Sequence, residues 1–165
     1  MTSPNVARTV ALGAVCTALV TVATMLSVPV PGFRLYFNLG EGVIYTVALL
    51  LGRRFGAAAG GLGAALADLL LGYALWAPLT LIIKGAEGFV VGTLAPKGRL
   101  KALLGGAVVM ITGYTLSAGV LYGWAAAPVE LGTDILQTGA GAAFALILAP
   151  VLARRVPFLQ KGSLQ

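Results

Sequence analysis

Histidine is absent from this sequence of 165 residues, and cysteine occurs once, as Cys16 in an apolar stretch. These absences argue against zinc sites and Cys-His catalysis, and a single thiol excludes a disulfide within the chain. The Gly-x-x-x-x-Gly-Lys-Ser/Thr motif is also missing, which argues against ATP hydrolysis by a P-loop. We therefore expect no enzyme activity, no cofactor and no metal site. An intramembrane enzyme that uses carboxylates alone is a minor alternative.

Charged residues are scarce, at 10% of the chain, whereas 59% of the residues are hydrophobic and the mean hydropathy is +0.97. A typical soluble domain has about 25% charged residues. This composition predicts an all-α integral membrane bundle in the cell membrane, with residues 1–165 as a single domain in the lipid bilayer. The net charge of +6 comes from short basic clusters without interleaved aromatics, so no binding to nucleic acid is expected.

Six transmembrane helices account for the apolar runs. Pro29, Pro31 and Gly32 end the first run, and Pro78 favours a helix start at the fourth. The second run is short for a full crossing of the bilayer. The expected spans are residues 7–28, 39–51, 55–72, 78–94, 100–124 and 133–152.

The basic residues predict the orientation of these helices. With both termini in the cytoplasm, every short cytoplasmic segment is basic, as the retention of Lys and Arg on that side requires. Arg34 then lies in an outer loop, and the last outer loop carries Glu130. The residues that favour two cytoplasmic termini are Arg8, Arg53, Arg54, Lys97, Arg99, Lys101, Arg154 and Arg155.

Three charged residues, Asp68, Lys84 and Glu87, lie inside predicted spans. An ionisable group at bilayer depth costs at least about 2.5–3.5 kcal/mol, so it usually faces a protein interior or an aqueous cavity. Lys84 and Glu87 are spaced i, i+3 and can pair on one helix face, and Asp68 lies at a compatible depth on the neighbouring span. The cluster is either an ion pair that joins helices or part of a ligand site.

Aromatic residues flank the outer helix ends, among them Tyr36, Trp76 and Trp124. Such residues ordinarily anchor helices in the membrane interface. They also form the walls of sites that combine aromatic surface with a few polar groups. Both interpretations stay open, and the second would suit a flat heteroaromatic ligand.

Small residues recur at helical spacing. In the first span they permit close packing within the chain or form a face for another membrane protein. The third and fourth spans carry glycines that permit close helix approach. The residues are Ala7, Ala11, Ala14 and Ala18 in the first span, and Gly56, Gly60, Gly88 and Gly92 in the third and fourth.

Three stretches, 38–44, 64–73 and 76–88, resemble the substrate-binding S components of energy-coupling factor (ECF) transporters. The resemblance extends over essentially the whole chain in size and number of spans, and it is most specific in the middle third. It implies a six-helix membrane subunit that binds a vitamin or vitamin precursor from outside. It also implies a transmembrane coupling subunit and two cytoplasmic ATPase subunits as partners, so the energy source is another chain.

The resemblance also implies roles for individual residues. It implies that the alanines of the first helix contact the coupling subunit, either as Ala14 and Ala18 or as Ala7 and Ala11. Glu41 and Asp68 lie on helices less often used for ligand, which favours structural or ion-pair roles. The substrate-binding residues that it nominates are Asn38, Trp76, Lys84, Glu87, Trp124, Asp134 and Gln137.

Several functions stay open at this point. Riboflavin, a thiamine pyrimidine precursor and pyridoxine all fit as ligands of an ECF-type importer. A self-contained secondary transporter of a small polar solute, driven by ions through Asp68 or Glu87, is the main alternative. No convincing inverted repeat relates residues 1–82 to 83–165, although such repeats are common in that class. A membrane assembly or scaffold protein is a third interpretation.

Overall fold

The structure, a computed structural model, describes residues 4–29 and 36–155, so Arg34 and the side chain of Tyr36 lie outside the described part. The described residues form six α-helices, one short 3-10 helix and one pair of short strands. The elements are α1 (Pro4–Met25), β1 (Ser27–Pro29), β2 (Tyr36–Asn38), α2 (Gly40–Leu51), α3 (Arg53–Leu71), α4 (Ala77–Leu94), η1 (Ala95–Lys97), α5 (Arg99–Tyr122) and α6 (Ala127–Arg155).

Five of the helices, α1, α3, α4, α5 and α6, are long and apolar enough to cross a membrane. The exception is α2, whose 12 residues extend about 18 Å against a hydrocarbon core of about 30 Å. The predicted all-α membrane bundle is therefore confirmed. The second apolar run forms a helix that is too short to cross the hydrocarbon core by itself.

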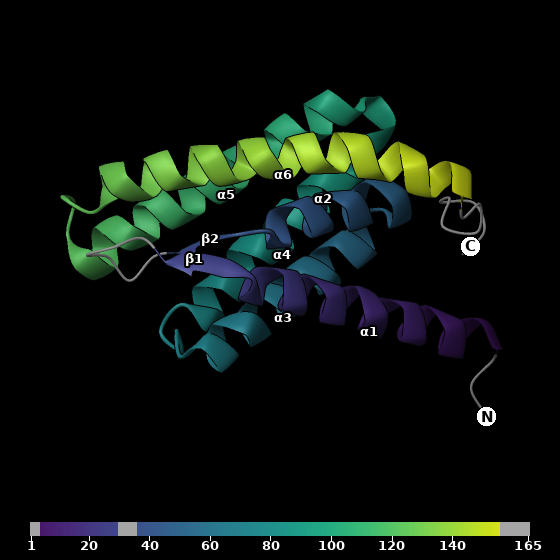
Figure 1. Cartoon of the computed structure of the whole chain (residues 1–165), viewed down its shortest axis with the longest axis horizontal. Helices are drawn as coiled ribbons and strands as arrows, with labels where there is room; N and C mark the ends of the chain where they lie inside the picture. Colours follow the sequence, from purple (N-terminus) through teal and green to yellow (C-terminus); the bar gives the residue numbers. More distant parts are fainter. Residues whose placement is uncertain (1–3, 30–35, 156–165) are drawn as a thin grey trace.

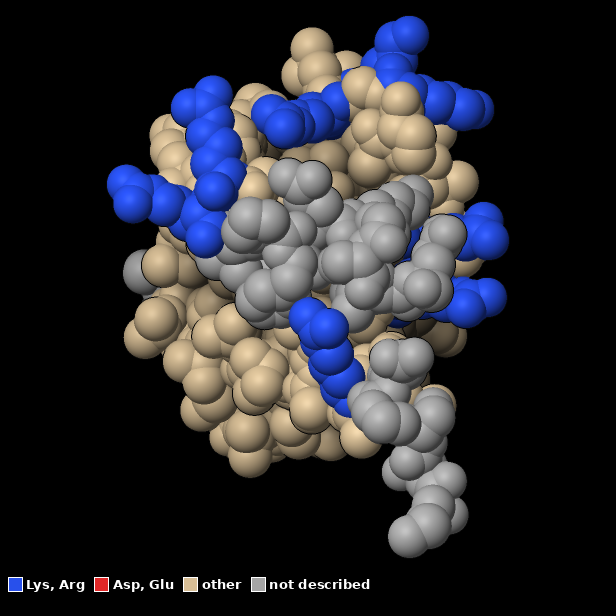
Figure 2. Space-filling view, turned by 90° about the vertical axis from the view of Figure 1, so that its right-hand side faces the viewer, with Lys and Arg blue, Asp and Glu red and all other residues tan. Residues whose placement is uncertain are grey.

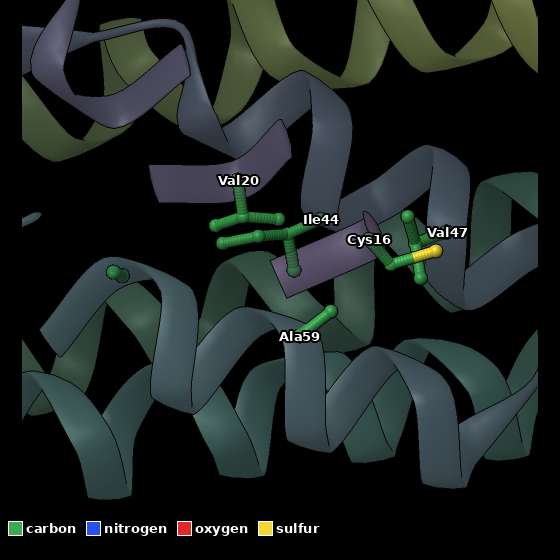
Figure 3. Close-up of a cluster of buried hydrophobic side chains, with 6 residues drawn as sticks. Cys16, Val20, Ile44, Val47 and Ala59 are labelled. Carbon is green, nitrogen blue, oxygen red and sulfur yellow. The ribbon is translucent and has the colours of Figure 1, made fainter. Parts of the chain in front are cut away.

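The short helix α2 lies inside the bundle. In Figure 3, Ile44 and Val47 of α2 pack against Cys16 and Val20 of α1 and Ala59 of α3. A second buried cluster joins α2 to α4, α5 and α6, and it contains Tyr45, Ala48, Val91, Ala102, Leu103 and Ala145. The other helices therefore cover α2 on several sides, and its polar residues face protein rather than lipid.

Helix α6 begins at Ala127, earlier than the expected start of the sixth span at residue 133. Glu130 was expected in the last outer loop, two residues after Pro128. However, proline is tolerated in the first turn of a helix, and a carboxylate in the first turn interacts favourably with the helix dipole. Glu130 thus belongs to the helix, and its side chain is buried.

The segment between α1 and α2 contains the antiparallel pair β1–β2, in which Ser27 pairs with Asn38. This pair is the one departure from the all-α class among residues 4–29 and 36–155. Its second strand ends at Asn38, which brings that side chain into the bundle immediately before α2.

The two ends of the bundle differ in charge. Figure 1 shows that α1 begins and α6 ends at the same end, and the view onto that end in Figure 2 shows Lys and Arg but no Asp or Glu. We call this the basic end. Its exposed residues lie at the start of α1, at the α2–α3 and α4–α5 junctions and at the end of α6, and they are Arg8, Arg53, Arg54, Lys97, Arg99, Lys101, Arg154 and Arg155. That this end faces the cytoplasm stays a prediction.

Glycines bring α3 and α4 into direct backbone contact. A Cβ atom added at Gly60 would lie 2.8 Å from the carbonyl oxygen of Lys84, and one added at Gly56 would lie 2.6 Å from that of Gly88. The predicted close approach of these two helices is therefore confirmed. It also sets the position of Lys84 relative to α3.

Replacing Gly60 with alanine should destabilise the protein, because the new methyl group would meet a backbone atom that cannot move alone. We expect the free energy of unfolding to fall by about 1–3 kcal/mol, measured as a lower Tm in detergent. Gly139→Ala on α6 is the matched control, since no atom lies within 4 Å of its added Cβ. Alanine is the better helix former, so the control should keep or raise the Tm. Equal changes of Tm in the two variants would contradict direct backbone contact between α3 and α4 at Gly60.

Candidate ligand-binding site

A cavity lies between the six helices at the end of the bundle remote from the basic end. It encloses about 50 Å³ of space open to water, which is room for roughly three to five water molecules. The residues that line it come from β2, from all six α-helices and from the turn before α4, and they are Thr24, Asn38, Ile44, Ala64, Asp68, Trp76, Thr80, Lys84, Met110, Tyr114, Glu130, Thr133, Asp134 and Gln137. Polar side chains from segments far apart in the sequence therefore meet in one place.

Most of the predicted substrate-binding residues lie at this cavity. Asn38, Trp76, Lys84, Asp134 and Gln137 all line it. The cavity wall also includes Asp68, for which the sequence favoured a structural role. Two other predicted residues, Glu87 and Trp124, do not belong to its lining.

Trp124 is 66% exposed and lies away from the cavity. The chain turns at Gly123, which has a φ of 90°, and the indole ring then packs over Gly119 of α5. Trp124 therefore does not line this cavity, and its role in substrate binding stays a prediction. An aromatic residue between two spans can face either way, and the turn geometry directs this one outward.

Asn38 and Gln137 connect the segment before α2 to α6. The backbone N–H and the side-chain amide of Asn38 donate to Gln137 Oε1, at 2.9 and 3.1 Å. Asn38 Oδ1 accepts a hydrogen bond from the Gly40 N–H at 2.8 Å, at the start of α2. Both side chains are buried. These hydrogen bonds hold β2 against the cavity wall.

Lys84 forms ion pairs with two glutamates from different helices. Its Nζ pairs with Glu41 Oε2 of α2, and it lies 3.1 Å from Glu87 Oε2 on its own helix. The partnership with Glu87 was expected from the i, i+3 spacing, whereas the partnership with Glu41 crosses between helices. The three side chains are almost completely buried, so the ion pairs join α2 to α4 in a medium of low dielectric constant.

Helix α6 covers this cluster of charges. A Cβ atom added at Gly141 would lie 2.6 Å from Cγ of Glu41, so the two backbones approach closely at that point. Lys84 Nζ also lies 5.4 Å from the centre of the Tyr114 ring. The ammonium group thus has two carboxylates and an aromatic ring as neighbours, and its charge is balanced by the protein itself.

Aromatic rings form one side of the cavity. The rings of Trp76 and Tyr114 are 5.6 Å apart between centroids, and the Trp76 Nε1 donates to Tyr122 Oη at 2.8 Å. The Tyr114 hydroxyl donates to Thr80 Oγ1 at 2.9 Å. These contacts fix the rings in place, so that they offer a rigid apolar surface beside the polar groups.

All five acidic residues of the chain are buried. Glu41 and Glu87 pair with Lys84, while Asp68, Glu130 and Asp134 line the cavity. Glu130 was missed as a site residue because its segment was interpreted as a loop. Its i, i+4 spacing from Asp134 could have indicated that the two side chains lie together, since residues at this spacing share one face of a helix.

The alanines of α1 lie on its exposed face. Ala7, Ala11, Ala14 and Ala18 are exposed, whereas Cys16 and Val20 on the opposite face pack into the bundle. This face is therefore available to another membrane protein or to lipid. Its role as a contact for a coupling subunit stays a prediction.

Lys84→Met should reduce both stability and ligand binding, because it leaves two buried glutamates without their cation. Removing one partner of a buried ion pair costs about 3–5 kcal/mol, so we expect a clearly lower Tm in detergent. Adding Glu41→Gln to Lys84→Met should recover part of the loss, since it removes one unpaired carboxylate. A Tm equal to that of the unmodified protein would contradict this role for Lys84.

Residues 5–154 match the family model for the ECF-type riboflavin transporter, S component. The chain is 43% identical over 149 residues to a Pyrococcus woesei protein described as "uncharacterized protein in gap 3'region", covering 86% of this chain and 99% of that protein. It is 35% identical over 143 residues to the thiamine precursor transporter HmpT of Lactococcus lactis subsp. cremoris, covering 86% of this chain and 85% of HmpT.

These similarities confirm the resemblance seen in the sequence, and they do not favour the self-contained secondary transporter. They identify a transporter component rather than an enzyme family. Because the family model covers nearly the whole chain, the protein belongs to the family of ECF-type riboflavin transporter S components and is a substrate-binding subunit of a vitamin importer in the cell membrane.

Proposed function

We propose that this S component captures the aminopyrimidine precursor of thiamine from the outer side of the membrane. The observation that carries the proposal is the number of acidic side chains at the cavity, where three carboxylates face a small space bounded by aromatic rings. An aminopyrimidine is a flat ring that brings N–H donors and a basic nitrogen, so it complements this lining. The similarity to HmpT, a thiamine precursor transporter, supports the same choice.

The charges of the site argue against an anionic ligand. Lys84 is the one buried cation among residues 4–29 and 36–155, and two glutamates already balance it. A phosphate or carboxylate would therefore add negative charge to a cavity that already contains Asp68, Glu130 and Asp134. Lys84 is therefore not available as the partner of an acidic group on the ligand.

The size of the cavity favours a small ligand. At about 50 Å³ it needs less rearrangement to admit a single pyrimidine ring than the three fused rings of a flavin. Riboflavin is nevertheless the second candidate, because the matching family model describes riboflavin transporters. It would require the segment around Asn38 and the outer ends of the helices to move apart.

The remaining parts of the proposal concern orientation and partners. The basic end is assigned to the cytoplasm, because Lys and Arg are retained there, and the cavity then opens toward the outside. The chain has no P-loop motif, so a transmembrane coupling subunit and two cytoplasmic ATPases would supply the energy. The exposed alanine face of α1 is the proposed contact with the coupling subunit.

The purified chain should bind the aminopyrimidine precursor with a Kd below about 1 μM, which corresponds to about −8.2 kcal/mol. Calorimetric titration in detergent measures this value directly. Riboflavin and pyridoxine serve as comparison ligands, and each should bind at least about tenfold more weakly. Tighter binding of riboflavin would overturn the choice of ligand and leave the assignment as an S component intact.

Ala14→Trp should prevent association with the coupling subunit, because a large ring on the alanine face would block close helix packing. Co-purification of the coupling subunit and ATPases with the tagged variant should fall at least about tenfold, whereas vitamin binding by the isolated chain should not change. Ala143→Trp on the exposed face of α6 is the matched control. Equal co-purification with the two variants would contradict an interface at Ala14.

A further inference from the structure

Glu130 and Asp134 form a pair of carboxylates on one wall of the cavity. They lie i, i+4 on α6, about 6 Å apart along the helix axis, and both line the cavity. Glu130 is 6% exposed and Asp134 is 4% exposed. Two acidic side chains are thus held almost completely out of solvent and directed toward the same small space.

Nearby hydroxyl groups do not satisfy these carboxylates. Thr133 Oγ1 donates to the Val129 carbonyl at 2.9 Å, and Thr138 Oγ1 donates to the backbone carbonyl of Asp134 at 2.8 Å. Within the described residues, Glu130 Oε2 and Asp134 Oδ2 accept no hydrogen bond. A buried polar atom without a partner costs about 1–3 kcal/mol, and more when it is charged, so its retention calls for a ligand that supplies a donor.

A purely structural role explains only one of the two residues. Glu130 lies in the first turn of α6, where a carboxylate interacts favourably with the helix dipole. Asp134 lies one turn further along, beyond the reach of that effect. The interaction with the helix dipole therefore does not explain why Asp134 is buried. It also does not explain why both residues face the cavity.

We propose that Glu130 and Asp134 recognise the amino group and the ring nitrogen of a basic heteroaromatic ligand, which enters the cavity as a protonated cation. This inference rests on the proposed function and names the atoms that select the ligand. One carboxylate accepts two parallel N–H bonds from the aminopyrimidinium edge, in the manner of a carboxylate with a guanidinium group, and the other accepts a remaining donor. The bound proton neutralises part of the negative charge that Lys84 leaves unbalanced.

The aromatic side of the cavity suits the same ligand. Trp76 and Tyr114 both line the cavity. A cationic ring that stacks on these side chains gains a cation–π interaction that a neutral ring of the same shape lacks. Selectivity for the charged form therefore comes from the carboxylates and from the aromatic wall together.

The test compares two ligands and three proteins by calorimetric titration. The ligands are the aminopyrimidine precursor and its analogue with hydrogen in place of the exocyclic amine. The proteins are the unmodified full chain, Glu130→Gln and Asp134→Asn, in which the amides keep the size of the acids. We expect each variant to weaken binding of the aminopyrimidine at least about tenfold, as loss of a charge-assisted hydrogen bond would. Binding of the deaminated analogue should be weak and nearly equal in all three proteins.

The Tm of each ligand-free protein distinguishes recognition from support of the fold. We expect the variants to match or exceed the Tm of the unmodified protein, because each substitution removes a buried charge whose carboxylate has an oxygen that accepts no hydrogen bond from the described residues. Variants that melt lower and bind both ligands equally poorly would overturn the inference, as would variants that bind the aminopyrimidine normally. Those outcomes would leave the proposed function intact. Failure of the unmodified chain to bind any pyrimidine would instead overturn this inference and the proposed function together, so the two failures can be distinguished.

Discussion

The ion pairs of Lys84 with Glu41 and Glu87 are the constraint around which the bundle is built. An isolated charge at this depth would be costly, so the ammonium group must have carboxylates within reach when the helices assemble. Glycine contacts make this geometry available. Gly60 lets α3 approach α4 at Lys84, and Gly141 lets α6 approach Glu41. Packing and electrostatics therefore act on the same few residues.

The protein separates its charges along the bundle. Basic residues surround one end and are exposed, whereas all five acidic residues are buried. The exposed charges remain hydrated, and they are the basis of the predicted orientation in the membrane. The buried acids must each be balanced by a cation, a proton or a ligand. This difference is why the proposed ligand site lies in the acidic interior.

Much of the candidate site could be predicted from the sequence, because charged and amide side chains near the outer ends of apolar helices are costly in lipid. They therefore face the protein interior or a cavity. The family resemblance nominated Asn38, Lys84, Asp134 and Gln137 among its candidates, and these four residues line one cavity. Trp124, which the resemblance nominated, does not line the cavity, whereas Glu130, which was not nominated, does. Both residues lie near the turn between α5 and α6. The direction of a side chain there depends on the backbone at Gly123 and on where α6 begins, and hydropathy reports neither.

The sequence by itself determined the membrane class, the approximate positions of the helices and the clustering of exposed basic residues between them. Helix formation and partition into lipid depend on local runs of apolar residues, so one chain suffices to predict them. Only the tertiary structure decided that α2 is an internal helix and that Glu41 pairs with Lys84, 43 residues away. It also decided that two carboxylates of α6 face the cavity, each with one oxygen that accepts no hydrogen bond from the described part of the chain. Those outcomes depend on which helix faces meet, and side-chain spacing along one helix does not specify its neighbour.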